Sequence, residues 1–199
     1  MNTRHSLLSM ESVAPRRAFG LNIRIDAYDA EAATAQSEIV HSVYAAQYQP
    51  GPDFAEWRDG VWRRHRARGG FDLLIARDGG EVAGVAWGYV GGRGQYWTDR
   101  AAAALPAGVG EAWLGGHFEV VELIVVPACR RRGVAGALLR ALLARTASSR
   151  ALLSVDDTNT AARSLYRSMG WELLGSYGSA MSIMGIDLRR ATGQAGSSR

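Results

Sequence analysis

The chain has 199 residues, 47% hydrophobic and 21% charged, a composition that suits one globular domain and excludes wholesale disorder. Its net charge is +4 and all 23 basic residues are arginine, which excludes mechanisms that need a lysine nucleophile or a Walker-type phosphate lysine. The single cysteine, Cys129, excludes a disulfide framework and a cysteine-rich zinc site. The four histidines lack metal-ligand spacing, so we expect no metal.

Composition also bears on location and partners. No apolar run approaches the roughly 20 residues that cross a bilayer, and residues 1–10 lack the apolar stretch of a secretion signal. We therefore expect a cytoplasmic protein without a membrane partner. The arginines fall in several small groups rather than along one stripe, which argues against a nucleic-acid partner.

The first quarter of the chain predicts an arm, a strand and two helices. Residues 1–19 are polar and mixed, and we expect them to form a flexible arm. Alternating apolar residues predict a strand over 21–25. Helical patterns follow over 29–47 and 53–67, separated by the helix-breaking run at 48–51.

A hairpin and a long connection come next. Predicted strands over 71–77 and 81–90 flank Asp78-Gly79-Gly80, a strong hairpin signal. Residues 91–116 contain many glycines and predict a long connection, with room for a short helix near 98–104.

The second half of the chain alternates strands and helices. The predicted elements are a strand over 118–126, a helix over 130–145, a strand over 151–155, a helix over 158–169, and strands over 171–176 and 181–188. This alternation predicts an α/β fold with a mixed sheet and parallel crossovers. We expect a single domain over 20–188 and a disordered polar tail over 189–199.

A glycine-rich turn lies between a buried strand and an amphipathic helix, where residues 130–136 read RRRGVAG. The first N–H groups of a helix are unpaired and carry a partial positive charge. Gly133, Ala135 and Gly136 keep bulky side chains away, so a pyrophosphate could reach these groups directly. The alternative is an ordinary glycine-rich turn beside a solvated arginine cluster.

Two motifs in this half resemble the GNAT (general-control-related N-acetyltransferase) superfamily. The first follows a strand that ends at Val126-Pro127 and reads Arg130-x-x-Gly133-x-Ala135. The second consists of Asn159, Ala162, Leu165 and Tyr166, followed by Gly170 and Trp171. Both occur in the family's order with one strand between them, and the resemblance covers roughly residues 20–188.

The resemblance implies a mixed, centrally splayed sheet of six to seven strands with helices on both faces. It also implies that acetyl-CoA binds with its pyrophosphate on the turn and its pantetheine arm along the fourth strand. The coenzyme residues it implies are Leu123, Ile124, Val125, Arg130, Arg131, Arg132, Gly133, Val134, Ala135, Gly136, Asn159 and Tyr166. Tyr166 would protonate the leaving thiolate, although its helical spacing also suits a core aromatic, and Asn159 could cap the helix as well.

The reaction of this family needs a base, because the acceptor amine must lose a proton before it attacks. Glu119 and Glu122 are three residues apart and would point to opposite faces of a regular strand, but family members often carry a bulge here. Glu119 stands eleven residues before Arg130, a spacing at which many members place the base. Glu122 is the second candidate and His117 the third; an arginine ion pair is the alternative role for a carboxylate.

The acceptor is less constrained by the sequence. Tyr96, Trp97 and Trp113 fall in the long connection that walls the acceptor side in this family, and aromatic rings would suit a cationic or ring-bearing amine. We expect an acetyl-CoA-dependent N-acetyltransferase acting on a primary amine: a small metabolite, an amine antibiotic or a peptide amine. The alternative is a non-catalytic acyl-CoA-binding sensor, which needs the turn but no base or acid. Cys129 is expected to be inert, and a homodimer is possible by analogy with the family.

Overall fold

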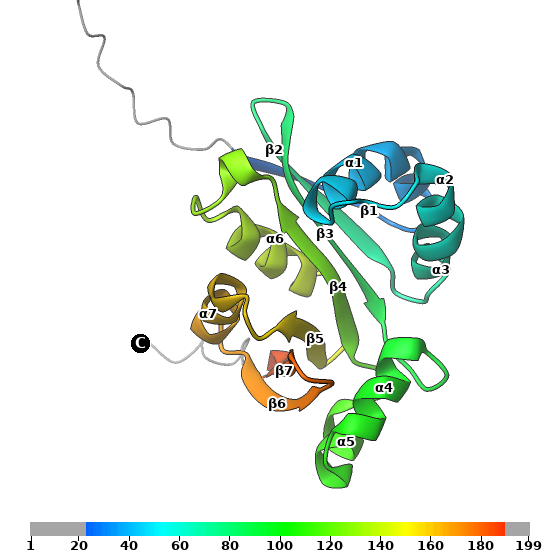
Figure 1. Ribbon diagram of the computed structural model, residues 1–199, viewed down its shortest axis with the longest axis vertical. Helices are drawn as coiled ribbons and strands as arrows, with labels where there is room; N and C mark the ends of the chain where they lie inside the picture. Colours follow the sequence, from blue (N-terminus) through cyan, green and yellow to red (C-terminus); the bar gives the residue numbers. More distant parts are fainter. Residues whose placement is uncertain (1–22, 190–199) are drawn as a thin grey trace, which may run out of the picture.

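A computed structural model describes residues 23–189 (Figure 1). The expected arm over 1–19 lies outside the described residues, as does the expected tail over 189–199 except for Arg189. The described chain forms one seven-stranded sheet with the order β1-β2-β3-β4-β5-β7-β6. The strands are β1 (Ile23–Tyr28), β2 (Asp72–Asp78), β3 (Glu81–Val90), β4 (Phe118–Val125), β5 (Arg150–Asp156), β6 (Glu172–Tyr177) and β7 (Met181–Asp187).

The sheet divides at its centre. All neighbouring strands pair antiparallel except β4 and β5, which are parallel. Those two strands pair only at Phe118 with Ala151 and at Glu119 with Leu152, near their beginnings. Beyond these pairs they separate, so their carboxyl ends leave open backbone in the middle of the sheet. The expected mixed, centrally splayed sheet with six to seven strands is confirmed.

Helices cover both faces, as expected. On β2, Leu74 and Ala76 join the core under α6 (Val134–Leu143) and α7 (Thr160–Ser168), whereas Leu73 and Ile75 join the core under α1 (Ser37–Gln47). Figure 1 shows α6 and α7 on one side of β4 and the α1–α3 layer on the other. Among residues 23–189, no helix is long and apolar enough to cross a membrane.

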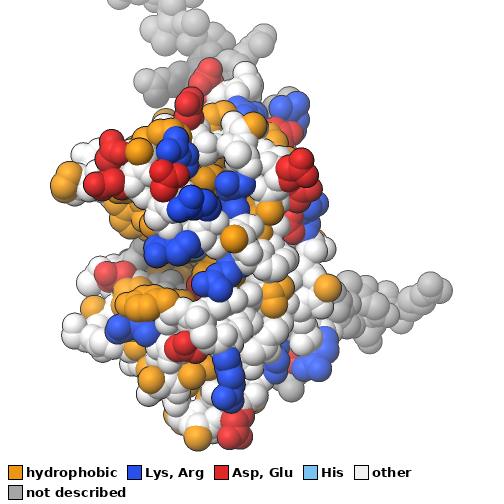
Figure 2. All heavy atoms as spheres, turned by 90° about the vertical axis from the view of Figure 1, so that its right-hand side faces the viewer, with side chains coloured by type: hydrophobic (Ala, Val, Ile, Leu, Met, Phe, Trp, Pro, Cys, Tyr) orange, Lys and Arg blue, Asp and Glu red, His pale blue; other side chains and the backbone are white. Residues whose placement is uncertain are grey.

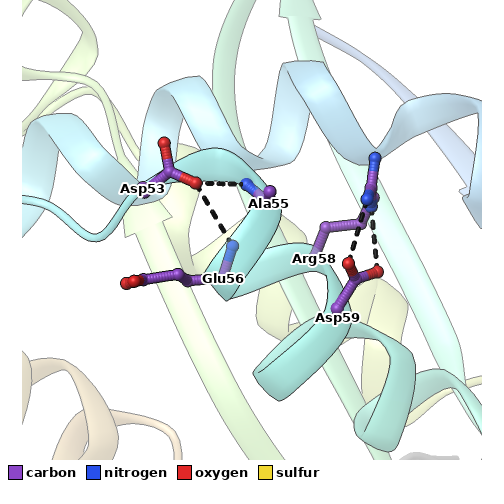
Figure 3. A network of polar contacts seen from close by, with 5 residues as sticks. All are labelled: Asp53, Ala55, Glu56, Arg58 and Asp59. Carbon is purple, nitrogen blue, oxygen red and sulfur yellow. Dashed lines mark hydrogen bonds and ion pairs between the residues drawn. The ribbon is translucent and has the colours of Figure 1, made fainter.

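The α1–α3 layer is more irregular than the sequence predicts. A 3-10 turn, η1 (Ala32–Gln36), precedes α1, and the predicted helix over 53–67 consists of α2 (Phe54–Trp57), a π-helical turn η2 (Arg58–Trp62) and α3 (Arg63–Arg66). Asp53 starts this segment, because its carboxylate accepts hydrogen bonds from the amides of Ala55 and Glu56 at 2.8 and 3.3 Å (Figure 3).

The wide π turn changes which side chains of this segment are buried. It brings Trp57 and Trp62, five residues apart, into a stacked pair with ring centroids 5.2 Å apart. Both indoles are buried, so Trp57 is a core residue. An ordinary α-helix would turn residues five apart toward different sides, which is why the regular helical stripe does not predict this pair.

The long connection over 91–116 is largely helical. It forms α4 (Tyr96–Ala104), close to the expected short helix, and a second helix, α5 (Ala107–Trp113), that the sequence pattern does not predict. Both pack against β5–β7 through a third apolar cluster that contains Ala101, Leu105, Leu152 and Ile183. Since Leu152 pairs with Glu119, this cluster lies on the same face of the sheet as α1.

A bulge in β4 sets the direction of its two carboxylates. Trp87 pairs with Glu122 and Tyr89 pairs with Glu119, so Val121 is the extra residue. Because Trp87 and Tyr89 are two apart on β3, they share a face, and their partners share it too. The expected parity-breaking bulge is therefore present, and Glu119 and Glu122 both lie on the α1 face.

Candidate active site

A pocket opens where β4 and β5 separate. Its volume is about 520 Å³, and it lies between β4, the start of α6 and one side of α7. Its lining residues are Gln47, Tyr48, Glu122, Leu123, Ile124, Val125, Cys129, Arg130, Arg131, Gly133, Val134, Ala135, Gly136, Asn159, Ala161, Ala162, Leu165 and Tyr166. Every predicted coenzyme residue except Arg132 is in this lining, together with one of the two candidate carboxylates.

The floor of the pocket at one end is the turn that begins α6. Arg131 and Gly133 have left-handed backbone, with φ of 61° and 84°, so the helix begins at Val134 and not at Arg130 as the sequence pattern predicts. No side chain caps the first turn of α6. A Cβ built on Gly133 would meet no atom within 4 Å, so the space before these amides is open. The amides of the first turn therefore face an accessible space, the arrangement that binds anions.

The three arginines of the turn have different roles. Arg130 is structural: its guanidinium donates to the Val125 carbonyl at 3.1 Å and to Oε1 of Gln47 at 2.9 Å, which fastens the turn to β4 and α1. Arg131 lines the pocket. Arg132 forms an ion pair with Asp78 at 3.7 Å, in the β2–β3 hairpin, and lies outside the lining.

α7 supplies the opposite wall. Asn159 caps the helix by accepting from the Ala162 amide at 3.1 Å, and it also lines the pocket, so both predicted roles are compatible. Tyr166 is 8% exposed and packs against Trp171, with ring centroids 5.8 Å apart. Burial, with a smaller contribution from the charge of Glu122, raises the pKa of Tyr166 to about 12. The hydroxyl is therefore protonated at neutral pH and available as a donor.

Glu122 lines the same pocket as Tyr166, and its charge acts on the Tyr166 hydroxyl. The hydroxyl of Tyr48, which follows α1, donates to both carboxylate oxygens of Glu122 at 3.0 and 3.2 Å. Burial raises the pKa of Glu122 to about 7, while the hydrogen bond from Tyr48 opposes that rise. A carboxyl group with this pKa accepts a proton readily near neutral pH.

Glu119 is more deeply enclosed. It is 4% exposed, accepts a hydrogen bond from the Tyr89 hydroxyl at 3.2 Å, and its Oε2 has no partner among the described residues. Burial raises the pKa of Glu119 to about 7, opposed by the Tyr89 hydrogen bond and by the charge of Arg68. It lies on the same face as Glu122, at the point where β4 and β5 still pair, outside the pocket lining.

Of the two remaining residues, His117 lies outside the pocket lining and Cys129 lies within it. His117 is fully buried and its Nδ1 accepts from the Gly115 amide at 3.2 Å; burial lowers the pKa of this imidazole to about 4. Cys129 is half-buried and lines the pocket. Among residues 23–189, no group of three or more histidine, cysteine or acidic side chains is arranged to hold a metal.

The three aromatic residues of the long connection are not brought into this pocket. Trp97 and Trp113 pack into the cluster under α4 and α5, and the Trp97 indole donates to the Ser154 hydroxyl at 3.1 Å. Tyr96 is 77% exposed, and the guanidinium of Arg100 lies 5.5 Å from its ring centroid. Their assignment to the acceptor site stays a prediction.

Sequence reasoning missed Gln47 and Tyr48. Both lie at the end of α1, more than 70 residues before the β4 and loop residues that they contact. The only local signal is the helix-breaking sequence at 48–51, which predicts where the helix ends but not what it meets.

Comparison with known proteins agrees with this geometry. The acetyltransferase (GNAT) family model matches residues 37–171. A GCN5-like protein acetyltransferase of Mycobacterium tuberculosis is 35% identical over 98 residues, which is 45% of this chain and 48% of that protein. The chain thus spans about half the length of this curated relative.

Solved structures share the fold at low sequence identity. The yncA protein of Salmonella typhimurium, solved with its cofactor acetyl-CoA, has a TM-score of 0.56 and 18% identity over 84% of this chain and 94% of that one. The PaiA N-acetyltransferase of Thermoplasma acidophilum, in complex with coenzyme A, has a TM-score of 0.54 and 13% identity over 84% and 99% of the two chains. With the family match covering most of the described residues, the chain belongs to the GNAT acetyltransferase family.

Proposed function

We propose that this acetyltransferase moves an acetyl group from acetyl-CoA to a primary amine, and that this amine is a lysine side chain of a protein. The observation that supports it best is the single pocket that joins an open helix N-terminus to Glu122 and Tyr166. The choice of a protein acceptor is supported by the relative in Mycobacterium tuberculosis, which is described as a protein acetyltransferase. We also propose a cytoplasmic location, as the sequence predicts.

The chain's residues suit acetyl-CoA. The free amides before α6 and the permanent charge of Arg131 would hold the pyrophosphate. Leu123 to Val125 run along the edge of β4 where β5 no longer pairs, so their backbone groups can bond an extended pantetheine arm. Acetyl-CoA, when bound, supplies the acetyl group as a thioester.

Glu122 is the base in this proposal. An alkylammonium has no lone pair, so the acceptor must give up a proton before its nitrogen can bond to the acetyl carbon. Glu122 takes that proton, directly or through water, because its raised pKa makes it a stronger base than an ordinary carboxylate. Sequence spacing favours Glu119. We prefer Glu122 because, of these two carboxylates, it is the one that lines the pocket with Tyr166.

Tyr166 completes the transfer. When the carbon–sulfur bond breaks, the electron pair stays on sulfur, and the Tyr166 hydroxyl donates a proton to the resulting thiolate. The second proton that the nitrogen loses as the amide forms returns to Tyr166. Its raised pKa keeps this proton in place until it is needed. A non-catalytic acyl-CoA sensor, the alternative function, would need neither Glu122 nor Tyr166 at these positions.

The test combines binding and turnover. Calorimetry with acetyl-CoA measures coenzyme binding, and thiol release measures transfer to lysine-containing peptides and to a panel of small amines. We expect Tyr166→Phe to bind acetyl-CoA like wild type and to lose about 10²-fold in kcat. Tyr28→Phe is the control, the same substitution on β1, outside the pocket lining. Saturable binding without transfer to any amine would favour the sensor, and transfer to small amines alone would overturn the protein acceptor.

A further inference from the structure

A group of unpartnered arginines lies on the segments near Glu119. Residues 60–71 contain four arginines and no acidic residue. We define the basic rim as Arg64, Arg68 and Arg93, whose side chains form no hydrogen bond or ion pair among the described residues. By contrast, Arg58 of the same helical segment pairs with Asp59 at 3.0 Å (Figure 3).

The basic rim is connected to Glu119 through short contacts. The ring of His65, beside Arg64, lies 5.4 Å from that of Tyr89, whose hydroxyl donates to Glu119 at 3.2 Å. The loop after α3 joins the end of β3 through a hydrogen bond of 2.8 Å from the Val90 amide to the Gly69 carbonyl. Arg68 precedes this joint and Arg93 follows it, so the two segments that carry the rim lie side by side.

The arginines of the basic rim act electrostatically on Glu119 and on His65. Arg68 lowers the pKa of Glu119, and Arg64 and Arg68 both lower the pKa of His65. Figure 2 shows arginine side chains gathered at mid-height of the flank on which α3 lies, around a hollow in the surface. A positively charged surface repels a lysine ammonium that has no acidic neighbours, so these arginines oppose an acceptor that carries only positive charge.

The exposure of the rim favours an extended ligand. Arg64 and Arg93 are exposed and Arg68 is half-buried, on two separate segments. A small acceptor with one carboxylate would need one enclosed arginine to hold it. Several guanidiniums on two surface segments instead fit several carboxylates spaced along a peptide, each contributing modestly.

We propose that the basic rim binds acidic residues on either side of the acceptor lysine, so that this enzyme acetylates lysines within acidic segments of proteins. This inference rests on the proposed function. The acidic residues would offset the repulsion between the basic rim and the lysine ammonium. They would also align the lysine so that it extends past Glu119 to Glu122.

The test uses two peptides with one lysine each, identical except that glutamates flank the lysine in one and glutamines in the other. We expect wild type to favour the glutamate peptide about 3- to 30-fold in kcat/KM, and to lose most of this preference at high ionic strength. The double variant Arg64→Gln/Arg68→Gln should remove the preference and leave the KM for acetyl-CoA unchanged. Arg58→Gln, which changes the net charge by one on the same segment, should keep it.

A binding measurement separates this inference from the proposed function. Fluorescence anisotropy of the labelled glutamate peptide reports recognition even if no acetyl group is transferred. Binding that depends on Arg64 and Arg68 without turnover would support the rim and overturn the lysine transferase. Equal use of both peptides, or an unchanged preference in the double variant, would overturn the rim.

Discussion

The two ends of β4 are built in different ways. At its carboxyl end, the pocket consists mostly of residues from three short segments: the turn over 130–136, four successive β4 residues and one side of α7. At its amino end, Glu119 is held by Tyr89 from β3, beside His65 from α3 and the helices of the long connection. The first end offers open backbone groups, whereas the second offers the side chains of Glu119, Tyr89 and His65.

This difference suggests that the two ends of β4 have different functions. The carboxyl end suits a coenzyme whose structure never changes, and the amino end suits an acceptor particular to this enzyme. Substitutions at the carboxyl end should therefore affect every acceptor equally, and those at the amino end should change acceptor preference. The experiments below test that separation.

The largest effect is expected at the proposed base. Glu122→Gln removes the proton acceptor and should lower kcat/KM about 10²- to 10⁴-fold for all amines. Glu119→Gln keeps the buried position and the Tyr89 contact and should cost much less. Steady-state thiol release measures both. A larger loss for Glu119→Gln would reverse our assignment and support the residue that sequence spacing favours.

A smaller effect is expected at the turn. Gly133→Ala forces a side chain into left-handed backbone, a strain of about 1–2 kcal/mol, and places a methyl group before the amides of α6. We expect the affinity for acetyl-CoA to fall about 10-fold by calorimetry. Gly79→Ala in the β2–β3 hairpin is the matched control, since its φ is +60° and its surroundings are also open. An equal loss of affinity in both variants would show that destabilisation, not the site, is responsible.

The smallest effect concerns Tyr48. Because the pKa of Glu122 is about 7, activity should fall as the pH drops through 7 and the carboxylate is protonated. Tyr48→Phe removes a hydrogen bond that lowers this pKa, so the acidic limb of kcat/KM should move to higher pH by less than about one unit. Tyr44→Phe is the control: its ring centroid lies 4.6 Å from that of Tyr48 in a tilted arrangement, but its hydroxyl donates no hydrogen bond to Glu122. A limb that stays in place in Tyr48→Phe would exclude Glu122 as the titrating group.

Prediction from sequence succeeded where structure is local. The alternation of strands and helices, the turn at Gly133 and the cap at Asn159 depend on neighbouring residues, so their patterns can be read along the chain. The bulge in β4 was expected from family resemblance alone, because nothing in the sequence marks Val121 as extra.

Contacts between distant segments could not be predicted in the same way. Tyr48 meets Glu122 across 74 residues, and no periodicity encodes that distance. The Trp57–Trp62 pair requires a π turn, which departs from the regular helical period used to find buried stripes. The helix α5 contains two glycines, and packing against β5–β7 outweighs their poor helix propensity.

Val121 is an extra residue in β4 because it has no partner on β3. Every side chain after it is shifted by one step in the up-and-down alternation, which turns the proposed base toward the α1 layer. If Val121 instead took a cross-strand partner in a regular strand, Glu122 would turn into the apolar packing beneath α6, where an unpaired carboxylate is severely penalised. One residue without a cross-strand neighbour thus keeps both acids of this strand on the reactive side.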